Sequence, residues 1–340
     1  MTEVVQEQEP DHIDADRPRP VRTVIGLTDH LFRGLSRTAG LIVLAIMSLV
    51  GLFLLYRGWQ ALSKAGVVAF ITTQRWEPDS NNFGIAAVLT GTVLIAVVAV
   101  VLAVPLATGT ALYIAEYAPL RIKSTLISLV DLMAAVPSIV YGLWGAYLLQ
   151  GQVIGLSRWI ASWFGWIPIF RVDGYDPNDP LSPMAVFTTS TFIAGIVVAL
   201  MITPIICSIM REVFSQAPIG EREGAYALGA TRWGMVRAVV LPFAAGGMIG
   251  GTMLGLGRAL GETIAVYLII SPVFTIQPHI LQSGANSISA LIALRFGEAT
   301  QFGMSALMAA GLALFLMTLV VNFAASSIVA RTRSGSASEA

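Results

Sequence analysis

Several features that would mark a soluble metalloenzyme are scarce in this chain. Only 12% of its 340 residues are charged, and cysteine occurs once, at position 207. A single cysteine cannot form a disulfide or a thiolate metal site within one chain. The three histidines, His12, His30 and His279, lie far apart in the sequence, so solvated side chains are a better interpretation than a metal site. We therefore expect no metal.

A phosphate-binding loop for ATP is also missing. Such a loop needs the sequence Gly-Lys-Ser/Thr to hold the phosphates. The lysines of this chain, Lys64 and Lys123, instead follow Ser63 and Ile122. The chain is therefore not expected to hydrolyse ATP through a P-loop or to hold a cofactor, and if ATP drives it, another subunit must supply the nucleotide site.

Long apolar runs are abundant: 56% of the residues are hydrophobic and the mean hydropathy is +0.76. A membrane-spanning helix takes about 20 apolar residues, whereas strands of a transmembrane barrel alternate over about 10 residues, and no such alternation is present. We predict an all-α, polytopic membrane protein with six transmembrane helices. They are expected near residues 39–62, 84–114, 124–149, 184–210, 243–271 and 302–329.

The basic residues predict how these spans are oriented, because loops on the cytoplasmic side retain an excess of Lys and Arg. With the N-terminus inside, thirteen basic residues are cytoplasmic and six are external. The cytoplasmic set is Arg17, Arg19, Arg22, Arg33, Arg37, Arg121, Lys123, Arg211, Arg222, Arg232, Arg237, Arg331 and Arg333. The external set is Arg57, Lys64, Arg75, Arg158, Arg171 and Arg295. Both termini are therefore expected in the cytoplasm, and the protein in the bacterial cytoplasmic (inner) membrane.

Three parts follow along the chain. Residues 1–38 form an acidic cytoplasmic segment that is too acidic for a signal peptide and is expected to be mobile. Residues 39–330 form the membrane domain, which includes a polar loop at 211–242, and residues 331–340 form a short cytoplasmic tail.

The polar loop at 211–242 contains a short predicted helix around Glu223, Gly224 and Ala225, which Gly229 would end as the residue after the C-cap. It can be interpreted as an ordinary polar loop or as an amphipathic element that docks in a groove of a partner. Composition alone does not separate these two readings.

The fifth predicted span combines a glycine stripe with two opposite charges. At 100° per residue, Gly247, Gly251, Gly255, Arg258 and Glu262 fall within a sector of about 80°, which is expected to face protein or a pore because charge facing lipid is costly. Arg258 and Glu262 can pair as i,i+4 neighbours. The pair can be a structural tie, or it can form an anion site in which Arg258 binds a phosphate-like oxyanion and Glu262 holds the guanidinium when the anion is absent.

Other residues in or near spans carry weaker signals. Asp131 lies within the third predicted span, either as a residue of a substrate pathway or as a carboxylate that reaches the membrane interface. The prolines Pro105, Pro137 and Pro204 are expected to kink their spans. In the external loop 150–183, three tryptophans predict a short helix in the headgroup region, namely Trp159, Trp163 and Trp166.

Several of these segments resemble one family across residues 40–330. The resemblance is carried by Trp76-Glu77-Pro78 with Phe83-Gly84, Thr90-Gly91-Thr92, Ala135 to Gly145, Glu223-Gly224-Ala225 with Gly229 and Val239 to Pro242, and Gly257 to Thr263. Together they resemble the C-type permease subunit (PstC) of bacterial phosphate-specific ABC importers, within the type I ABC-importer transmembrane family. The loop resembles the EAA motif of such permeases, from which Gly224 and Val239 depart, and Gly224 loosens the helix by up to about 1 kcal/mol.

The resemblance implies a transport subunit without its own nucleotide site. It implies a second, A-type permease, two ATP-binding subunits that hold ATP and Mg, and an external phosphate-binding protein. It also implies alternating access, with the helix at Glu223 to Gly229 inserted in the ATPase and with Arg258 and Glu262 in the phosphate pathway. The Gly257 to Thr263 segment is similar in sulfate and molybdate permeases, so another oxyanion is the alternative substrate, and a passive channel or scaffold is a further one.

Overall fold

The computed structural model describes residues 26–334, except 178, 180 and 181. The longer helices are α1 (Leu27–Ala65), α3 (Ala86–Leu112), α4 (Leu120–Ala135), α6 (Gln150–Phe164), α7 (Thr191–Ser215), α10 (Leu241–Gly261) and α13 (Gln301–Ser334). The shorter ones are α2 (Val67–Thr72), α5 (Ser138–Trp144), α8 (Ile219–Ala227), α9 (Arg232–Met235), α11 (Ile264–Ile269) and α12 (Ile288–Arg295).

Short π-helical and 3₁₀ segments continue or connect these helices. The π-helices are η3 (Tyr113–Tyr117), η4 (Gly145–Leu149) and η7 (Val236–Val240). The 3₁₀ turns are η2 (Pro78–Ser80), η5 (Pro168–Phe170), η6 (Met184–Phe187) and η8 (Phe296–Glu298). One antiparallel hairpin joins β1 (Trp76–Glu77) to β2 (Asn82–Phe83), with Trp76 opposite Phe83.

Six helical runs in the described part of the chain are long and apolar enough to cross a membrane, so the predicted number is confirmed. They are Thr28–Ala65, Ala86–Tyr117, Ser138–Phe164, Thr191–Ser215, Arg232–Gly261 and Gln301–Ser327. The second and sixth lie close to their predicted bounds. The first begins at Thr28 instead of near residue 39, the fourth covers Thr191–Ser215 instead of 184–210, and the third and fifth are displaced at both ends.

The predicted third span, 124–149, is divided at Val136, whose ψ of 128° is extended. Pro137 causes this break, because proline disfavours helical backbone in the residue before it. Residues before the break form α4, and the run after it continues through α5, η4 and α6 as far as Phe164. Trp159 and Trp163 of the predicted short helix lie in α6, which is continuous with α5, whereas Trp166 lies in the turn after α6 ends at Phe164. Pro105 and Pro204 lie inside the continuous helices α3 and α7.

The fifth span starts earlier and ends earlier than predicted. It begins at Arg232 and passes through the π-helix η7 into α10. A π-helical turn is expected at η7 because Pro242, just after it, has no N–H to donate to the carbonyl four residues earlier. The helix ends at Gly261, and the predicted end of the span falls on the separate helix α11.

The described chain divides into two units between Val50 and Gly51. The first is the beginning of helix α1, whose apolar side chains, such as Leu41 and Leu44, are exposed. Residues 1–25 of the acidic segment and residues 335–340 of the tail lie outside the described residues. Residues 27–38, assigned to the acidic segment, belong to α1.

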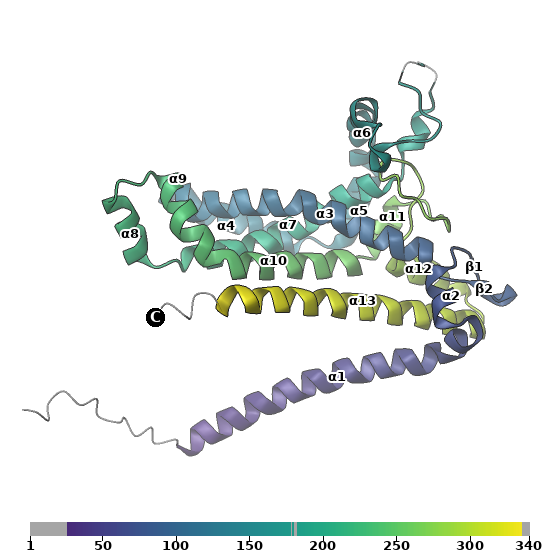
Figure 1. Cartoon of the computed structure of the whole chain (residues 1–340), viewed down its shortest axis with the longest axis horizontal. Coiled ribbons are helices and arrows are strands. Elements are labelled where there is room, and N and C mark those ends of the chain that lie inside the picture. The colour runs from purple at the N-terminus through teal and green to yellow at the C-terminus, as the bar shows by residue number, and fades with distance from the viewer. Residues whose placement is uncertain (1–25, 178, 180–181, 335–340) are drawn as a thin grey trace, which may run out of the picture. The chain divides into compact units, whose positions relative to one another are not determined.

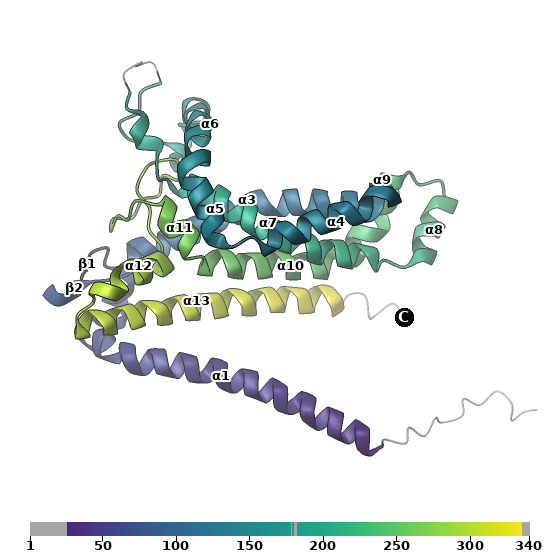
Figure 2. The same ribbon diagram turned by 180° about the vertical axis from the view of Figure 1, so that it is seen from behind.

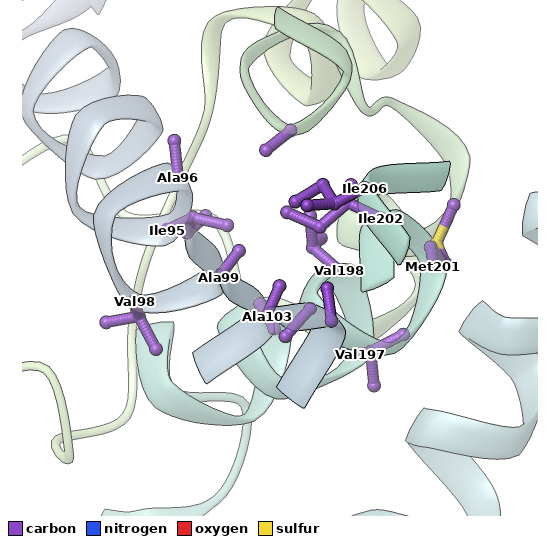
Figure 3. Packing of buried hydrophobic residues seen from close by; sticks show 14 of the residues in the cluster. Ile95, Ala96, Val98, Ala99, Ala103, Val197, Val198, Met201, Ile202 and Ile206 are labelled. Carbon is purple, nitrogen blue, oxygen red and sulfur yellow. The ribbon is translucent and has the colours of Figure 1, made fainter. Parts of the chain in front are cut away.

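The second unit, from Gly51 onward, is built around α7, the most buried of the six spans. Along α3, alanines at four-residue spacing are fully buried, and Figure 3 shows two of them, Ala99 and Ala103, beside aliphatic side chains of α7. This row is Ala99, Ala103, Ala107 and Ala111. Small residues at this spacing let two helix backbones approach closely, so α3 and α7 form one packed pair.

Helix α10 packs on α7 through its glycines. A Cβ at Gly247 would lie 2.5 Å from Val213, and one at Gly255 would lie 2.5 Å from Ile206. Gly251 faces Ile209 in the same way, at 3.2 Å. The predicted glycine stripe is therefore confirmed as a face that contacts protein, and its neighbour is α7.

The two ends of this unit are built differently (Figures 1 and 2). At one end α8 and α9 lie beyond the helices α7 and α10, and α13 runs back toward that end. At the other end the β1–β2 hairpin lies beside α2 and α12, and α6 leads away from the bundle. Aromatic contacts at the hairpin end join Phe83 to Phe70, Trp76 and Phe302.

Gly91 of α3 provides a test of this packing. A Cβ at Gly91 would overlap the backbone carbonyl of Asn286, whereas Gly109 on the same helix has nothing within 4 Å. We expect Gly91→Ala to destabilise the protein by about 1–3 kcal/mol, because a backbone atom cannot rotate away. Gly109→Ala is the matched control and is expected to be neutral or stabilising, since alanine favours helix. Thermal unfolding in detergent measures both, and equal melting temperatures for the two variants would contradict the close approach.

Candidate functional site

Helix α8 contains the residues predicted for coupling, Glu223, Gly224 and Ala225, and its end is confirmed at Gly229. Gly229 has a φ of +83°, which glycine adopts without steric cost. Its N–H donates to the carbonyl of Tyr226 at 2.9 Å, and the N–H of Ala230 donates to that of Ala225 at 3.0 Å. These two bonds form a Schellman motif, so the chain turns sharply after α8.

One side of α8 is open and the other is packed. Glu223 and Gly224 are exposed, whereas Ala225 is half-buried against the core of the bundle. Next to them Leu228 is 91% exposed and Ile219 is 72% exposed. Apolar side chains held in the open beside a charged one are typical of a surface that binds another protein.

The packed side of α8 is held by Arg222, a contact that the sequence analysis did not find. Its Nη1 lies 2.9 Å from Oε1 of Glu116 and donates to Oε2 at 3.1 Å. Its Nε donates to the carbonyl of Ala217 at 3.1 Å, and its Nη2 donates to that of Phe214. The available signal was a lone carboxylate, Glu116, directly after the apolar run of α3.

Arg258 lies three residues before the end of α10 and its side chain is exposed. The glycines of the predicted stripe contact α7, but Arg258 is not buried with them. The expected ion pair with Glu262 is not among the ion pairs within 4.0 Å in the described part of the chain, which are Arg171–Asp173, Arg222–Glu116, His279–Asp173 and Arg295–Glu298. The i,i+4 pairing of Arg258 with Glu262 is therefore wrong for this conformation.

The end of α10 explains why the pair does not form. The helix stops at Gly261, and Glu262 is the extended residue after it, with a ψ of 126°. Its buried carboxylate accepts a hydrogen bond from the N–H of Ala265 at 3.3 Å, in the first turn of α11. Its carbonyl accepts one from Oγ of Ser289 at 2.7 Å. Glu262 thus connects α10, α11 and α12.

A buried polar cluster surrounds this connection, and sequence reasoning did not predict it. The N–H of Ile288 donates to Oγ1 of Thr92 at 3.0 Å, and the hydroxyls of Ser287 and Ser289 lie 3.3 Å apart. Asn286 is buried beside them, and its Nδ2 has no hydrogen-bond partner within the described structure. These residues come from α3, from the start of α12 and from the segment leading into it.

Asp131, the third residue predicted for a substrate pathway, lies on α4. Its side chain is exposed, and Oδ1 accepts a hydrogen bond from Oγ of Ser208 on α7 at 3.1 Å. The contact ties α4 to α7. No hydrogen bond or ion pair in the described part of the chain joins Asp131 to Arg258 or Glu262, so the three predicted pathway residues are not in direct polar contact.

Residues that could hold a metal do not come together in the described residues, where no group of three or more His, Cys, Asp and Glu side chains has suitable geometry. His279 contacts Asp173 at 3.5 Å and Gln282 at 3.1 Å in the outer loops. Cys207 is buried in α7. His12 lies outside the described residues.

Comparisons with known proteins all find membrane components of transport systems. Residues 103–334 match the model of the family described as "Binding-protein-dependent transport system inner membrane component". The chain is 38% identical over 294 residues to a "Phosphate transport system permease protein PstC" of Xylella fastidiosa, which covers 86% of this chain and 88% of the relative. It is 37% identical over 304 residues to "Phosphate transport system permease protein PstC 2" of Mycobacterium tuberculosis, covering 88% and 91%.

A solved structure shares the fold. It is the "bacterial alginate ABC transporter in complex with alginate pentasaccharide-bound periplasmic protein", with a TM-score of 0.57 and 17% identity. The match covers 90% of this chain and 97% of that chain. This similarity supports an ABC importer transmembrane fold.

The placement of Glu262 predicts which of its properties stabilises the protein. Glu262→Ala leaves the buried N–H of Ala265 without an acceptor, which costs about 1–3 kcal/mol. Glu262→Gln keeps an acceptor oxygen and is expected to lose less. Thermal unfolding of the purified complex compares them. If Gln destabilises as much as Ala, the negative charge and not the hydrogen bond is what the fold requires.

Proposed function

Because this chain belongs to the PstC family of inner membrane components of binding-protein-dependent transport systems, we propose that it forms part of the path by which an ATP-driven importer carries inorganic phosphate inward. As a member of that family it is a permease subunit of a phosphate ABC transport system, a multi-pass protein of the inner membrane, and not an enzyme. It works in a complex with an ATPase and a binding protein, as the family implies.

The finer composition of the complex is part of the proposal. A related A-type permease pairs with this chain, and two ATPase subunits hold ATP and Mg. A phosphate-binding protein delivers phosphate on the outer side. Apolar side chains of spans such as α13 are exposed, among them Leu319 and Phe323. In this proposal, lipid or the second permease covers them.

Both termini lie in the cytoplasm in this proposal. The excess of basic residues in the segments around α8 supports this orientation. The course of α13 supports it as well, because the helix runs toward the end that carries α8. The outer end then carries the β1–β2 hairpin and the long loop after α6.

Helix α8 acts as the coupling helix, and its exposed face is the observation that carries the proposal. Glu223 and Leu228 are exposed and can contact a partner, whereas Arg222 holds the opposite side of the helix on the bundle. An amphipathic helix of this kind enters a groove of the ATPase. When ATP closes the ATPase subunits, α8 moves with them and the spans open toward the outside.

Arg258 is the anion-binding group of the pathway in this proposal. An arginine at mid-membrane depth costs at least about 2.5 kcal/mol if it faces lipid, and no described side chain neutralises Arg258. Its exposed guanidinium is therefore available to a phosphate ion, for which its fork of donors is suited. Glu262 supports the site by fixing where α10 ends, and Asp131 contributes only by holding α4 on α7.

Arg258 can be tested by changing its charge and its shape separately. We expect Arg258→Ala to lower phosphate uptake at least about tenfold, the effect of losing one charge-assisted contact. Arg258→Lys keeps the charge but loses the fork, so its uptake should be intermediate. Uptake is measured in proteoliposomes that contain the whole complex, with Arg158→Ala, an exposed arginine of α6, as control. Unchanged uptake in both Arg258 variants would remove this residue from the pathway.

The function as a whole is tested by the coupling of ATP hydrolysis to the anion. In the reconstituted complex, the phosphate-loaded binding protein should stimulate ATP hydrolysis, whereas sulfate or molybdate should not. Glu223→Ala should lower both stimulation and uptake, because it removes a charge from the face of α8 that meets the ATPase. Stimulation by sulfate alone would contradict the substrate, and indifference to Glu223→Ala would contradict the role of α8.

A further inference from the structure

The π-helix η3, at the end of α3, is the point where three cationic side chains from three different helices meet. Lys123 of α4 donates to the carbonyl of Ala115 at 3.3 Å. Arg222 of α8 binds Glu116, and the guanidinium of Arg232 on α9 lies 5.1 Å from the ring centre of Tyr117. Three consecutive residues of one turn are thus each held by a different element, and we call this arrangement the η3 clasp.

The central contact of the η3 clasp is buried. The side chain of Glu116 is 5% exposed and that of Arg222 is 20% exposed. The other donors of Arg222 bind the carbonyls of Phe214 and Ala217, at the end of α7 and just after it. One guanidinium therefore joins α8 to the last turns of both α3 and α7. A buried pair of this kind is lost only at high cost when one partner is removed.

The helices behind the η3 clasp can move as one body. The buried alanine row of α3 runs along α7 as far as Ala111, two residues before η3 begins. Because α3 and α7 are closely packed, a displacement of η3 shifts both helices together. The chain itself joins α8 to α7 through residues 216–218 and to α10 through α9 and η7, but it gives α8 no direct covalent link to α3. The η3 clasp is a further, non-covalent connection from α8 to the bundle.

We propose that Glu116 is a positioning residue that transmits the movement of α8 to α3 and so keeps α3 in step with α7, with Arg222 as its partner. This inference rests on the proposed role of α8 as the coupling helix. It assigns the outputs of α8 to different connections: α7 and α10, which bears Arg258, follow through the chain, and α3 follows through the ion pair. Transport requires both sides of the bundle to move in step.

The π geometry of η3 fits this role. A π turn contains one more residue than an α turn and is frequently found at functional sites. It lets Ala115, Glu116 and Tyr117 meet partners on α4, α8 and α9.

The experiment uses the whole complex, with both permeases, the ATPase subunits and the phosphate-binding protein, in proteoliposomes. Glu116→Gln removes the charge at nearly constant size, and Glu116→Asp is the conservative variant. Arg121→Gln, an exposed basic residue in the first turn of α4, is the control for charge at this end. Four quantities are measured: ATPase subunit binding, basal ATP hydrolysis, its stimulation by the phosphate-loaded binding protein, and phosphate uptake.

We expect Glu116→Gln to retain ATPase binding and basal hydrolysis but to lose stimulation and uptake by about tenfold, within the range of coupling between distant sites. Glu116→Asp should recover part of both, and Arg121→Gln should behave as the unchanged protein. The inference is overturned if the complex with Glu116→Gln shows normal stimulation of ATP hydrolysis and normal phosphate uptake. It is also overturned if the losses merely follow a lower melting temperature and weaker ATPase binding, since the ion pair then only fastens α8.

Glu223→Ala separates this inference from the proposed function. If Glu223→Ala leaves uptake unchanged, α8 is not the coupling helix, and the proposed coupling role fails together with the inference that rests on it. If Glu223→Ala lowers uptake and Glu116→Gln does not, α8 still couples and only the role of the η3 clasp fails.

Discussion

The close contact of α7 with α3 and α10 is the constraint on which the rest of the bundle depends. Alanines on α3 and glycines on α10 let both backbones approach α7. In a membrane the hydrophobic effect does not drive helices together, so van der Waals packing between small residues must hold them. Gly91 extends the same principle to the buried segment around Asn286, which fixes the polar cluster beside Glu262.

On α10, the residues that pack against α7 are different from the one that carries the charge. The glycine face of α10 is occupied by α7, whereas Arg258 is exposed. At the other end of the helix the chain leaves η7, which follows α9 and α8. The exposed face of α8 and the exposed charge of Arg258 are thus the two ends of one continuous segment. The η3 clasp ties the start of that segment to the α3–α7 pair as well.

Much of the architecture could be predicted from residue patterns, because apolar length, Pro and Gly act locally. The six spans, the helix of α8 and its end at Gly229 follow from such signals. The third span could not be bounded, because its apolar run continues past Pro137 and the break depends on a single residue. The prediction of an ion pair between Arg258 and Glu262 was wrong for a similar reason. The i,i+4 spacing assumes that the helix continues to Glu262, but α10 ends at Gly261.

The sequence by itself determined the class of the protein: a chain with so little charge and so many apolar runs must cross a membrane, and its motifs place it among phosphate permeases. Only the tertiary structure decided which charges meet. Glu116 and Arg222 are 106 residues apart, and no local pattern relates residues at that distance. Their pairing depends on α3 and α7 ending at the same level beside α8, which is a property of the packed bundle.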